Sequence, residues 1–165
     1  MSEIKIRKWM KSDFKSVRKI LLQTWLKTYS FIPEKDIFIH FEKFYNEAKL
    51  NILYTDPYTQ CFISELDGTP AGWMKLLNNV SQKRFYVSSL YVLPEFQGFG
   101  IGKALMNKAD ETARSKNYDR IWIGVMSENK RALNWYTKQG FIFPEEEPFQ
   151  MGNTTVMHLI GYKLI

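Results

Sequence analysis

The spacing of apolar residues along the chain alternates between the period of a β-strand and the period of an α-helix. Residues 4–9 alternate apolar with charged side chains, which predicts a half-buried strand. Residues 12–28 then carry apolar side chains at helical spacing, behind a Ser-Asp pair that can cap the first turn. A second helical stretch, residues 33–45, opens on a Pro-Glu pair and gathers its apolar residues on one face.

The rest of the chain continues this alternation. Three strands are predicted at residues 60–66, 71–77 and 84–92, and an Asp-Gly hairpin turn joins the first two. The second half then reads as a helix at 98–117, a strand at 120–126, a helix at 129–138 and strands at 140–143 and 154–164. Strand-helix-strand units argue for parallel crossovers, whereas the hairpins argue for antiparallel pairing. We therefore expect an α/β (α+β) fold, one domain over residues 1–165 with a mixed sheet covered by helices.

Composition and charge narrow the class of protein. With 45% apolar and 24% charged residues, the chain resembles an ordinary globular protein. The net charge of +6 is scattered, and its densest stretch, residues 5–19, has strand and helix spacing, which favours a solvated face over a nucleic-acid surface. The chain shows no apolar leader and no run long enough to span a membrane. We expect a cytoplasmic protein, a monomer or homodimer, that binds neither nucleic acid nor membrane.

The cysteine content limits the chemistry. A single cysteine, Cys61, excludes an internal disulfide and a multi-cysteine metal site. Its position in the apolar run 60–66 is more typical of a small strand residue than of a nucleophile. We therefore expect neither a covalent intermediate on cysteine nor a bound metal.

The most informative stretch is the junction between a strand and a helix at residues 89–105. Gly98, Gly100 and Gly102 are spaced two apart there, and a helix begins directly after them. Because glycine has no Cβ, backbone N–H groups can approach a bulky anion closely. The helix start adds unpaired N–H groups and the positive end of its dipole. This arrangement predicts a phosphate site.

Two common phosphate loops do not match these residues. A Walker A loop needs glycine where this chain has Gln97, and Ser or Thr where it has Ala104. A dinucleotide fingerprint places its third glycine one residue later than Gly102. A glycine-rich turn without a ligand remains the alternative, although its glycines would then cost about 0.5–1 kcal/mol each in helical positions for no return.

The junction resembles the acetyl-CoA motif of the GCN5-related N-acetyltransferase (GNAT) superfamily, Gln/Arg-x-x-Gly-x-Gly/Ala after a strand. Gln97, Gly100 and Gly102 fill the defined positions. A second matching segment follows, with Ile121-Trp122-Ile123-Gly124-Val125, Asn129, Ala132, Tyr136 and Gly140-Phe141. The likeness spans residues 84–143 and implies a mostly antiparallel, twisted sheet of about seven strands with about four helices and splayed central parallel strands.

The resemblance implies which residues hold acetyl-CoA. The backbone of Leu90, Tyr91 and Val92 would pair with the pantetheine arm like an added strand. Backbone N–H groups would hold the diphosphate along Gln97, Gly98, Phe99, Gly100, Ile101, Gly102 and Lys103. Asn129 and Ala132 would contact the pantetheine.

Tyr136 is the expected catalytic residue. The resemblance implies that its hydroxyl lies near the coenzyme sulfur, where a phenol is acidic enough to protonate or hydrogen-bond the leaving thiolate. The alternative is a core aromatic residue that packs with Trp135 or Phe141. An acceptor amine must also be neutral to react, although the pKa of such an amine is about 10.4.

The acceptor is less constrained by the sequence. Residues 121–129, 136–141 and 149–152 look like bacterial polyamine N-acetyltransferases of the PaiA type, which acetylate spermidine and spermine. In such relatives a Glu pair precedes the loop where this chain has Ser88 and Ser89, which puts a carboxylate base on this strand in doubt. Alternatives are a protein N-terminus, a protein lysine, an aminoglycoside, or a coenzyme A-sensing module without catalysis.

The acceptor side is expected in the second helical stretch. Glu34, Asp36 and Tyr29 are the candidate substrate-binding residues, and Glu34, Asp36 and His40 are candidate bases. The two carboxylates are equally consistent with first-turn charges that favour the helix dipole, and His40 with a surface residue. The acidic cluster at residues 145–147 is a candidate amine entrance, or a solvated loop.

Overall fold

A mixed sheet of seven strands forms the centre of the molecule, in the order β1-β2-β3-β4-β5-β7-β6. The computed structural model describes residues 1–165. The strands are β1 (Ile4–Lys8), β2 (Thr59–Leu66), β3 (Thr69–Asn79), β4 (Arg84–Val92), β5 (Arg120–Met126), β6 (Ile142–Met151) and β7 (Thr154–Leu164). Neighbouring strands are antiparallel except β4 and β5, which run parallel. The expected mixed, mostly antiparallel sheet is confirmed.

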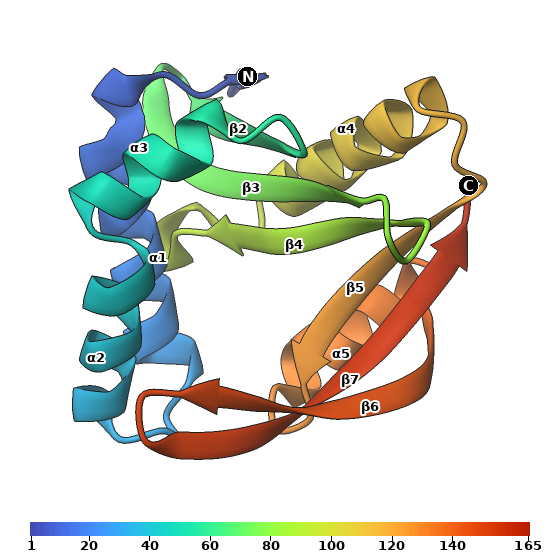
Figure 1. Ribbon diagram of the computed structural model, residues 1–165. Coiled ribbons are helices and arrows are strands. Elements are labelled where there is room, and N and C mark those ends of the chain that lie inside the picture. The colour runs from blue at the N-terminus through green and yellow to red at the C-terminus, as the bar shows by residue number, and fades with distance from the viewer.

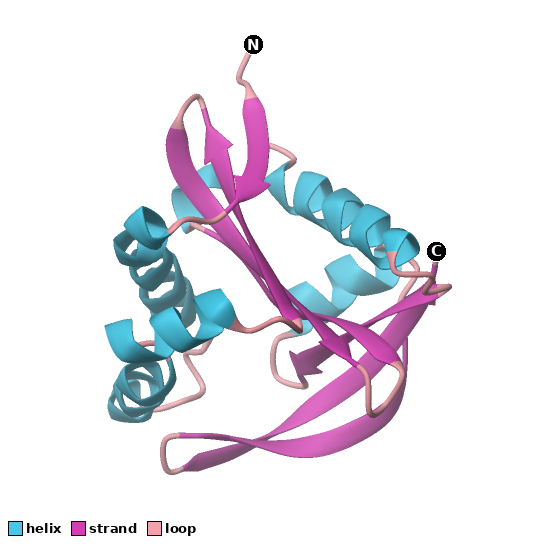
Figure 2. Ribbon diagram, turned by 45° about the horizontal axis from the view of Figure 1, so that its top comes forward, coloured by secondary structure: helices cyan, strands magenta, loops and turns pink.

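Helices cover both faces of this sheet (Figure 2). They are α1 (Phe14–Thr28), α2 (Glu34–Phe44), α3 (Glu47–Thr55), α4 (Ile101–Ser115) and α5 (Lys130–Lys138). Figure 1 shows α1, α2 and α3 grouped together, away from α4 and α5. None of the helices combines the length and the apolar character that a membrane-spanning helix needs.

Two hydrophobic cores lie on the two faces of the sheet. Alternate residues of β2 point to opposite faces, so Ile63 joins one core while its neighbour Phe62 joins the other. Trp25 of α1 and Trp73 of β3 belong to the core under α1, α2 and α3. Leu105 of α4 belongs to the core under α4 and α5. Hydrophobic packing therefore stabilises the sheet on both of its faces.

The sheet opens between β4 and β5. These two strands pair only at Tyr86–Trp122 and Val87–Ile123 and then diverge (Figure 1). A β-bulge on β4 begins at the next residue, since Val87 and Ser89 have partners on β3 whereas Ser88 has none. A bulge bends its strand and increases the local twist. The expected splay of the central parallel strands is confirmed.

Two elements differ from the prediction. Helix α3 was not expected, because among its residues only Leu50 is buried and no apolar stripe marks the helix. Asn46 caps the first turn of α3 by accepting a hydrogen bond from the Lys49 N–H. Strand β6 runs well beyond the predicted residues 140–143 despite Pro144 and Pro148. It lies at the edge of the sheet, where the missing N–H of proline is tolerated.

Candidate active site

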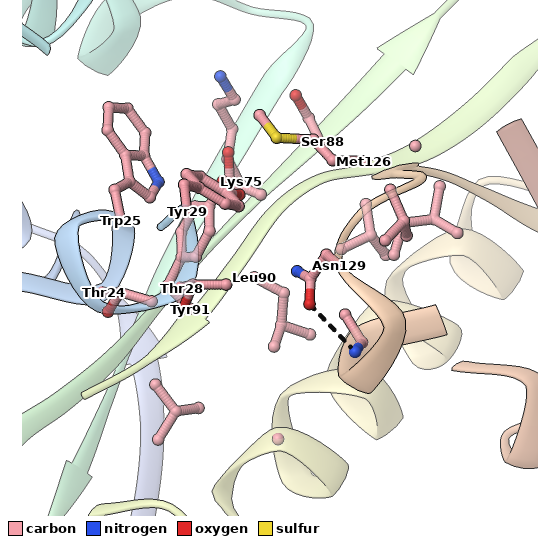
Figure 3. Close-up of a pocket in the computed structure, with 18 of the residues that line it drawn as sticks. Thr24, Trp25, Thr28, Tyr29, Lys75, Ser88, Leu90, Tyr91, Met126 and Asn129 are labelled. Atoms are coloured by element: carbon pink, nitrogen blue, oxygen red, sulfur yellow. Dashed lines mark hydrogen bonds between the residues drawn. The ribbon is translucent and has the colours of Figure 1, made fainter. Parts of the chain in front are cut away.

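A cavity of about 1200 Å³ occupies the opening between β4 and β5. Its walls come from β4, β5, the start of α4, α5, helices α1 to α3 and the β6–β7 hairpin. Figure 3 shows that side chains of α1, β3 and β4 face those of β5 and of the start of α5 across this space. The cavity therefore brings together segments that are far apart in the sequence.

Strand β4 presents a free edge to the cavity. Beyond Val87 its backbone has no partner on β5, and Leu90, Tyr91 and Val92 line the space. An unpaired strand edge offers N–H and C=O groups in the extended spacing that another strand-like chain can match. The geometry agrees with the predicted pairing of this segment with an extended ligand.

The loop before α4 exposes a series of unpaired N–H groups. Backbone N–H groups from Gly98 to Lys103 donate to no acceptor in the protein, whereas the next N–H, of Ala104, bonds the Gly100 carbonyl at 3.0 Å. Gly98 and Gly100 both have φ of +87°, which other residues rarely adopt. Gln97 Nε2 donates to the Val92 carbonyl at 3.1 Å and fixes the loop to β4. These donors, at a helix start, form an anion site.

The side chains of this loop divide into two groups. Ile101 is buried in the core and anchors the helix start. Phe99 is 51% exposed and does not line the cavity, so only its backbone is available to a ligand there. Lys103 and Arg131 do line the cavity and add positive charge beside the free N–H groups.

The start of α5 forms the opposite wall. Asn129 Oδ1 accepts a hydrogen bond from the Ala132 N–H at 3.2 Å and so caps α5. The amide nitrogen of Asn129 points into the open space (Figure 3). Both Asn129 and Ala132 line the cavity.

Tyr136 is packed in the core and yet reaches the cavity. Its ring is 7% exposed and lies edge-on to Trp135 and Phe141, at centroid distances of 4.9 and 5.6 Å. The hydroxyl makes no hydrogen bond and is not enclosed by protein, and the residue lines the cavity. Burial raises the pKa of Tyr136 well above its ordinary value, and nearby Tyr91 adds to the effect. The hydroxyl therefore keeps its proton and can donate a hydrogen bond.

Aromatic residues dominate the far end of the cavity, which we call the acceptor end. It is formed by α1, α2, α3, β3 and the β6–β7 hairpin. Tyr29 lies at the end of α1, and burial raises its pKa to about 12. His40 and His158 lie on either side of Phe149, with ring centroids 5.5 and 4.2 Å from it. Burial lowers the pKa of both histidines to about 4, so their imidazoles are neutral at pH 7.

The structure places the predicted acceptor carboxylates outside the cavity. Glu34 is exposed on the first turn of α2 and lines no part of it. Asp36 is buried and accepts hydrogen bonds from Thr154 Oγ1 at 2.6 Å and from the Asn153 N–H at 3.0 Å. These bonds, led by the one from Thr154, lower the pKa of Asp36. Asp36 therefore joins α2 to the β6–β7 hairpin.

The acidic cluster at residues 145–147 lines no part of the cavity, although the next residue, Pro148, does. It is exposed on edge strand β6. Glu145 forms an ion pair with Arg84, at 2.8 Å between Nη2 and Oε2 and 3.2 Å between Nη1 and Oε1. An amine entrance at this cluster stays a prediction.

Comparison with known proteins identifies the family. The family model described as "Acetyltransferase (GNAT) family" matches residues 14–141. The chain belongs to this acetyltransferase family. An uncharacterized N-acetyltransferase from Mycobacterium tuberculosis is 34% identical over 107 residues, which cover 65% of this chain and 68% of that protein.

Solved structures share the acetyltransferase fold. The PaiA N-acetyltransferase from Thermoplasma acidophilum, crystallised with coenzyme A, superimposes with a TM-score of 0.81 at 22% identity, over 99% of both chains. The spermidine/spermine N-acetyltransferase SpeG from Vibrio cholerae superimposes with a TM-score of 0.71 at 21% identity, over 98% of this chain and 92% of that one. At these identities the likeness concerns the fold.

Sequence reasoning missed much of this acetyltransferase's acceptor end. Trp25, Thr24 and Lys75 all line the cavity, and none was singled out. Trp25 sits in an apolar helical pattern, and Lys75 is one charged residue in a strand. No local motif marks such residues, because their function depends on the packing of distant elements.

Proposed function

We propose that the protein transfers an acetyl group directly from acetyl-CoA to a primary amine. The observation that supports this most is the run of unpaired N–H groups from Gly98 to Lys103 at one end of the cavity. Orphan backbone donors at a helix start suit a diphosphate, and the glycines leave room for it. Lys103 and Arg131 supply further positive charge. The residues present thus fit the diphosphate of the coenzyme.

The remaining cavity residues fit the other parts of the reaction. Acetyl-CoA supplies an acetyl thioester, whose carbon the amine attacks and whose sulfur leaves as a thiolate. The free edge of β4 and the Asn129 amide would hold the extended arm. The backbone N–H of Leu90 or Val92, which alternate with the β3-facing N–H of Tyr91, would stabilise the developing oxyanion. Tyr136 would donate a hydrogen bond to the leaving thiolate, which takes up the proton that the attacking nitrogen releases as the amide forms.

No side chain of the cavity is suited to remove the proton of the amine. His40 is the one candidate base that lines the cavity, and its pKa of about 4 makes it a weak base for a group whose pKa is about 10.4. Ser88 and Ser89 stand where a Glu pair would lie. In the proposal, the amine therefore loses its proton to water before it attacks.

Calorimetry and a thiol-release assay test the proposal together. Coenzyme A and acetyl-CoA should both bind, and acetyl-CoA should release free thiol only when a primary amine is added. A coenzyme A-sensing module would show binding without thiol release from any amine. Absence of coenzyme binding would remove the basis of the proposal.

Spermidine is the acceptor that the PaiA resemblance implies, and it stays a prediction, as do a cytoplasmic location and a monomeric or homodimeric state. The fold likeness to the Vibrio cholerae enzyme is compatible with a polyamine but identifies no acceptor residue. The carboxylates expected to attract a polycation lie outside the cavity. Spermidine therefore belongs in the amine panel beside amines of different charge.

A further inference from the structure

The acceptor end is poor in negative charge. Asp56 is the only carboxylate residue among all those that line the cavity. Its oxygens are already engaged, since Oδ1 accepts from the Tyr58 N–H at 3.0 Å and Oδ2 from Thr59 Oγ1 at 2.7 Å. Lys49 and Lys75 line the same end. A polycation would therefore meet more positive than negative charge.

Lys75 is a half-buried cation without an anionic partner. It forms no ion pair within 4 Å, and its ammonium group contacts only the Tyr45 hydroxyl at 3.3 Å, with the Tyr45 ring centroid at 5.4 Å. On β3 it is paired with Ser89, next to the bulge where the cavity begins. Charged groups that leave solvent are usually paired, so a ligand is the natural source of its counter-charge.

Two side chains of α1 form an enclosed part of the cavity wall. Trp25 is 2% and Thr24 6% exposed, and both residues line the cavity. The Trp25 indole nitrogen and the Thr24 hydroxyl are themselves enclosed by protein. Figure 3 shows the indole nitrogen turned towards Tyr29 and Tyr91. Neither polar atom is therefore open to a ligand in the cavity, in contrast to the ammonium group of Lys75.

The electrostatics of His40 agree with a positive potential here. Burial is the main cause of its lowered pKa, and the positive charges of Lys43 and Lys75 lower it further. Tyr29, Tyr45, Tyr91 and His158, which also face this end, carry no positive charge at neutral pH. Lys49 and Lys75 thus outnumber the single carboxylate of Asp56 at this end.

We infer that the acceptor is a small amine that also carries a carboxylate, which Lys75 binds. The inference rests on the proposed acetyl transfer and names its substrate class as amino-carboxylates rather than polyamines. The carboxylate provides the missing counter-charge of Lys75. Binding through this group holds the amine in the cavity between Lys75 and Tyr136.

Matched pairs of acceptors test the inference. Each pair differs only by the carboxylate: 6-aminohexanoate and hexylamine, L-lysine and cadaverine, L-phenylalanine and phenethylamine, with spermidine as a polycation. We expect kcat/KM to be higher for the carboxylate member of at least one pair, by about tenfold or more, as for a charge-assisted hydrogen bond.

Variants of Lys75 test whether this residue causes the preference for the carboxylate acceptor. Lys75→Met should reduce the preference within that pair to about one, and Lys75→Glu should reverse it towards cadaverine and spermidine. Lys5→Met removes the same charge from the exposed face of β1, far from the cavity, and should leave the preference unchanged. Calorimetric coenzyme A affinity reports whether each variant is folded.

The outcomes separate this inference from the proposed function. If amines are acetylated but hexylamine, cadaverine or spermidine is used as well as every amino-carboxylate, the inference is wrong and the acetyl transfer stands. A preference that survives Lys75→Met would also overturn it. If coenzyme A does not bind, or no amine releases thiol, the proposed transfer fails first.

Discussion

At the scale of single residues, Tyr136 both packs in the core and lines the cavity. Its ring packs edge-on between Trp135 and Phe141, which fixes the direction of the hydroxyl. Burial raises its pKa, so the proton stays on the oxygen at any pH the enzyme would meet. The two interpretations that the sequence left open, core aromatic and catalytic acid, are therefore compatible.

Replacing Tyr136 by Phe tests the acid role. The ring contacts stay, so coenzyme A affinity should change less than about twofold, while kcat should fall by about 10²–10⁴-fold, the usual contribution of a general acid. Steady-state kinetics and calorimetry measure the two quantities. In the native enzyme kcat should not decline up to about pH 9, because the raised pKa keeps the hydroxyl protonated. An unchanged kcat in the variant would contradict the role.

Asp36 offers a second test at this scale. Asp36→Ala removes two hydrogen bonds that hold the β6–β7 hairpin, so we expect a loss of about 1–3 kcal/mol of unfolding free energy and a higher amine KM. Coenzyme A affinity should be unaffected, because the diphosphate site is remote. Glu34→Ala is an exposed substitution on the same helix turn, and it should change the unfolding free energy by no more than about 0.5 kcal/mol. Denaturant unfolding compares the two variants. Equal stability of both would show that Asp36 is not structural.

At the scale of elements, the sequence predicts what is local. Alternation and helical spacing located most strands and helices, and the glycine junction located the run of unpaired N–H groups at the cavity, because both signals lie within short stretches. Helix α3 was missed because only Leu50 of it is buried, and the length of β6 because proline is tolerated at a sheet edge. The acceptor end was missed because it is assembled from separate elements, α1, α2, α3, β3 and the β6–β7 hairpin.

The first turn of α4 allows binding and stability to be separated. A Cβ on Gly102 would meet Trp135 no closer than 3.4 Å, so Gly102→Ala should fold normally and gain up to about 1 kcal/mol from helix propensity. The added methyl group would crowd the free N–H groups and lower coenzyme A affinity by about tenfold or more. Gly100→Ala is the contrasting control, because φ of +87° makes alanine strained, by about 1–2 kcal/mol. Full affinity in Gly102→Ala would place the diphosphate elsewhere.

At the scale of the whole molecule, the buried histidines set the response to acid. His40 and His158 have folded pKa values of about 4, below the ordinary value of about 6.5. The unfolded chain therefore binds more protons than the folded one once the pH falls below 6.5. The unfolding free energy should fall as the pH drops from 6.5 to 4 and level off with respect to these groups below that. Asp36, whose pKa is lowered, loses its contribution only at still lower pH.

A double variant isolates the contribution of the two histidines to the pH dependence of the unfolding free energy. His40→Gln with His158→Gln removes both titrating groups, so its stability should depend less on pH between 6.5 and 4 than that of the native protein. Because the variant also loses ring contacts with Phe149, the slope with pH is the quantity to compare, not the absolute stability. Thermal unfolding over this range measures it. Parallel slopes would show that other groups control the acid response.

The divergence of β4 from β5 also shapes the dynamics of the free protein. Only two residue pairs bridge these strands, so the β4 amides beyond Val87 have no partner on β5. A coenzyme arm lying along β4 would extend the strand ladder and protect these amides. Deuterium uptake by the β4 amides beyond Val87 would then slow when coenzyme A binds, so exchange kinetics would register occupancy even where no acetyl group is transferred.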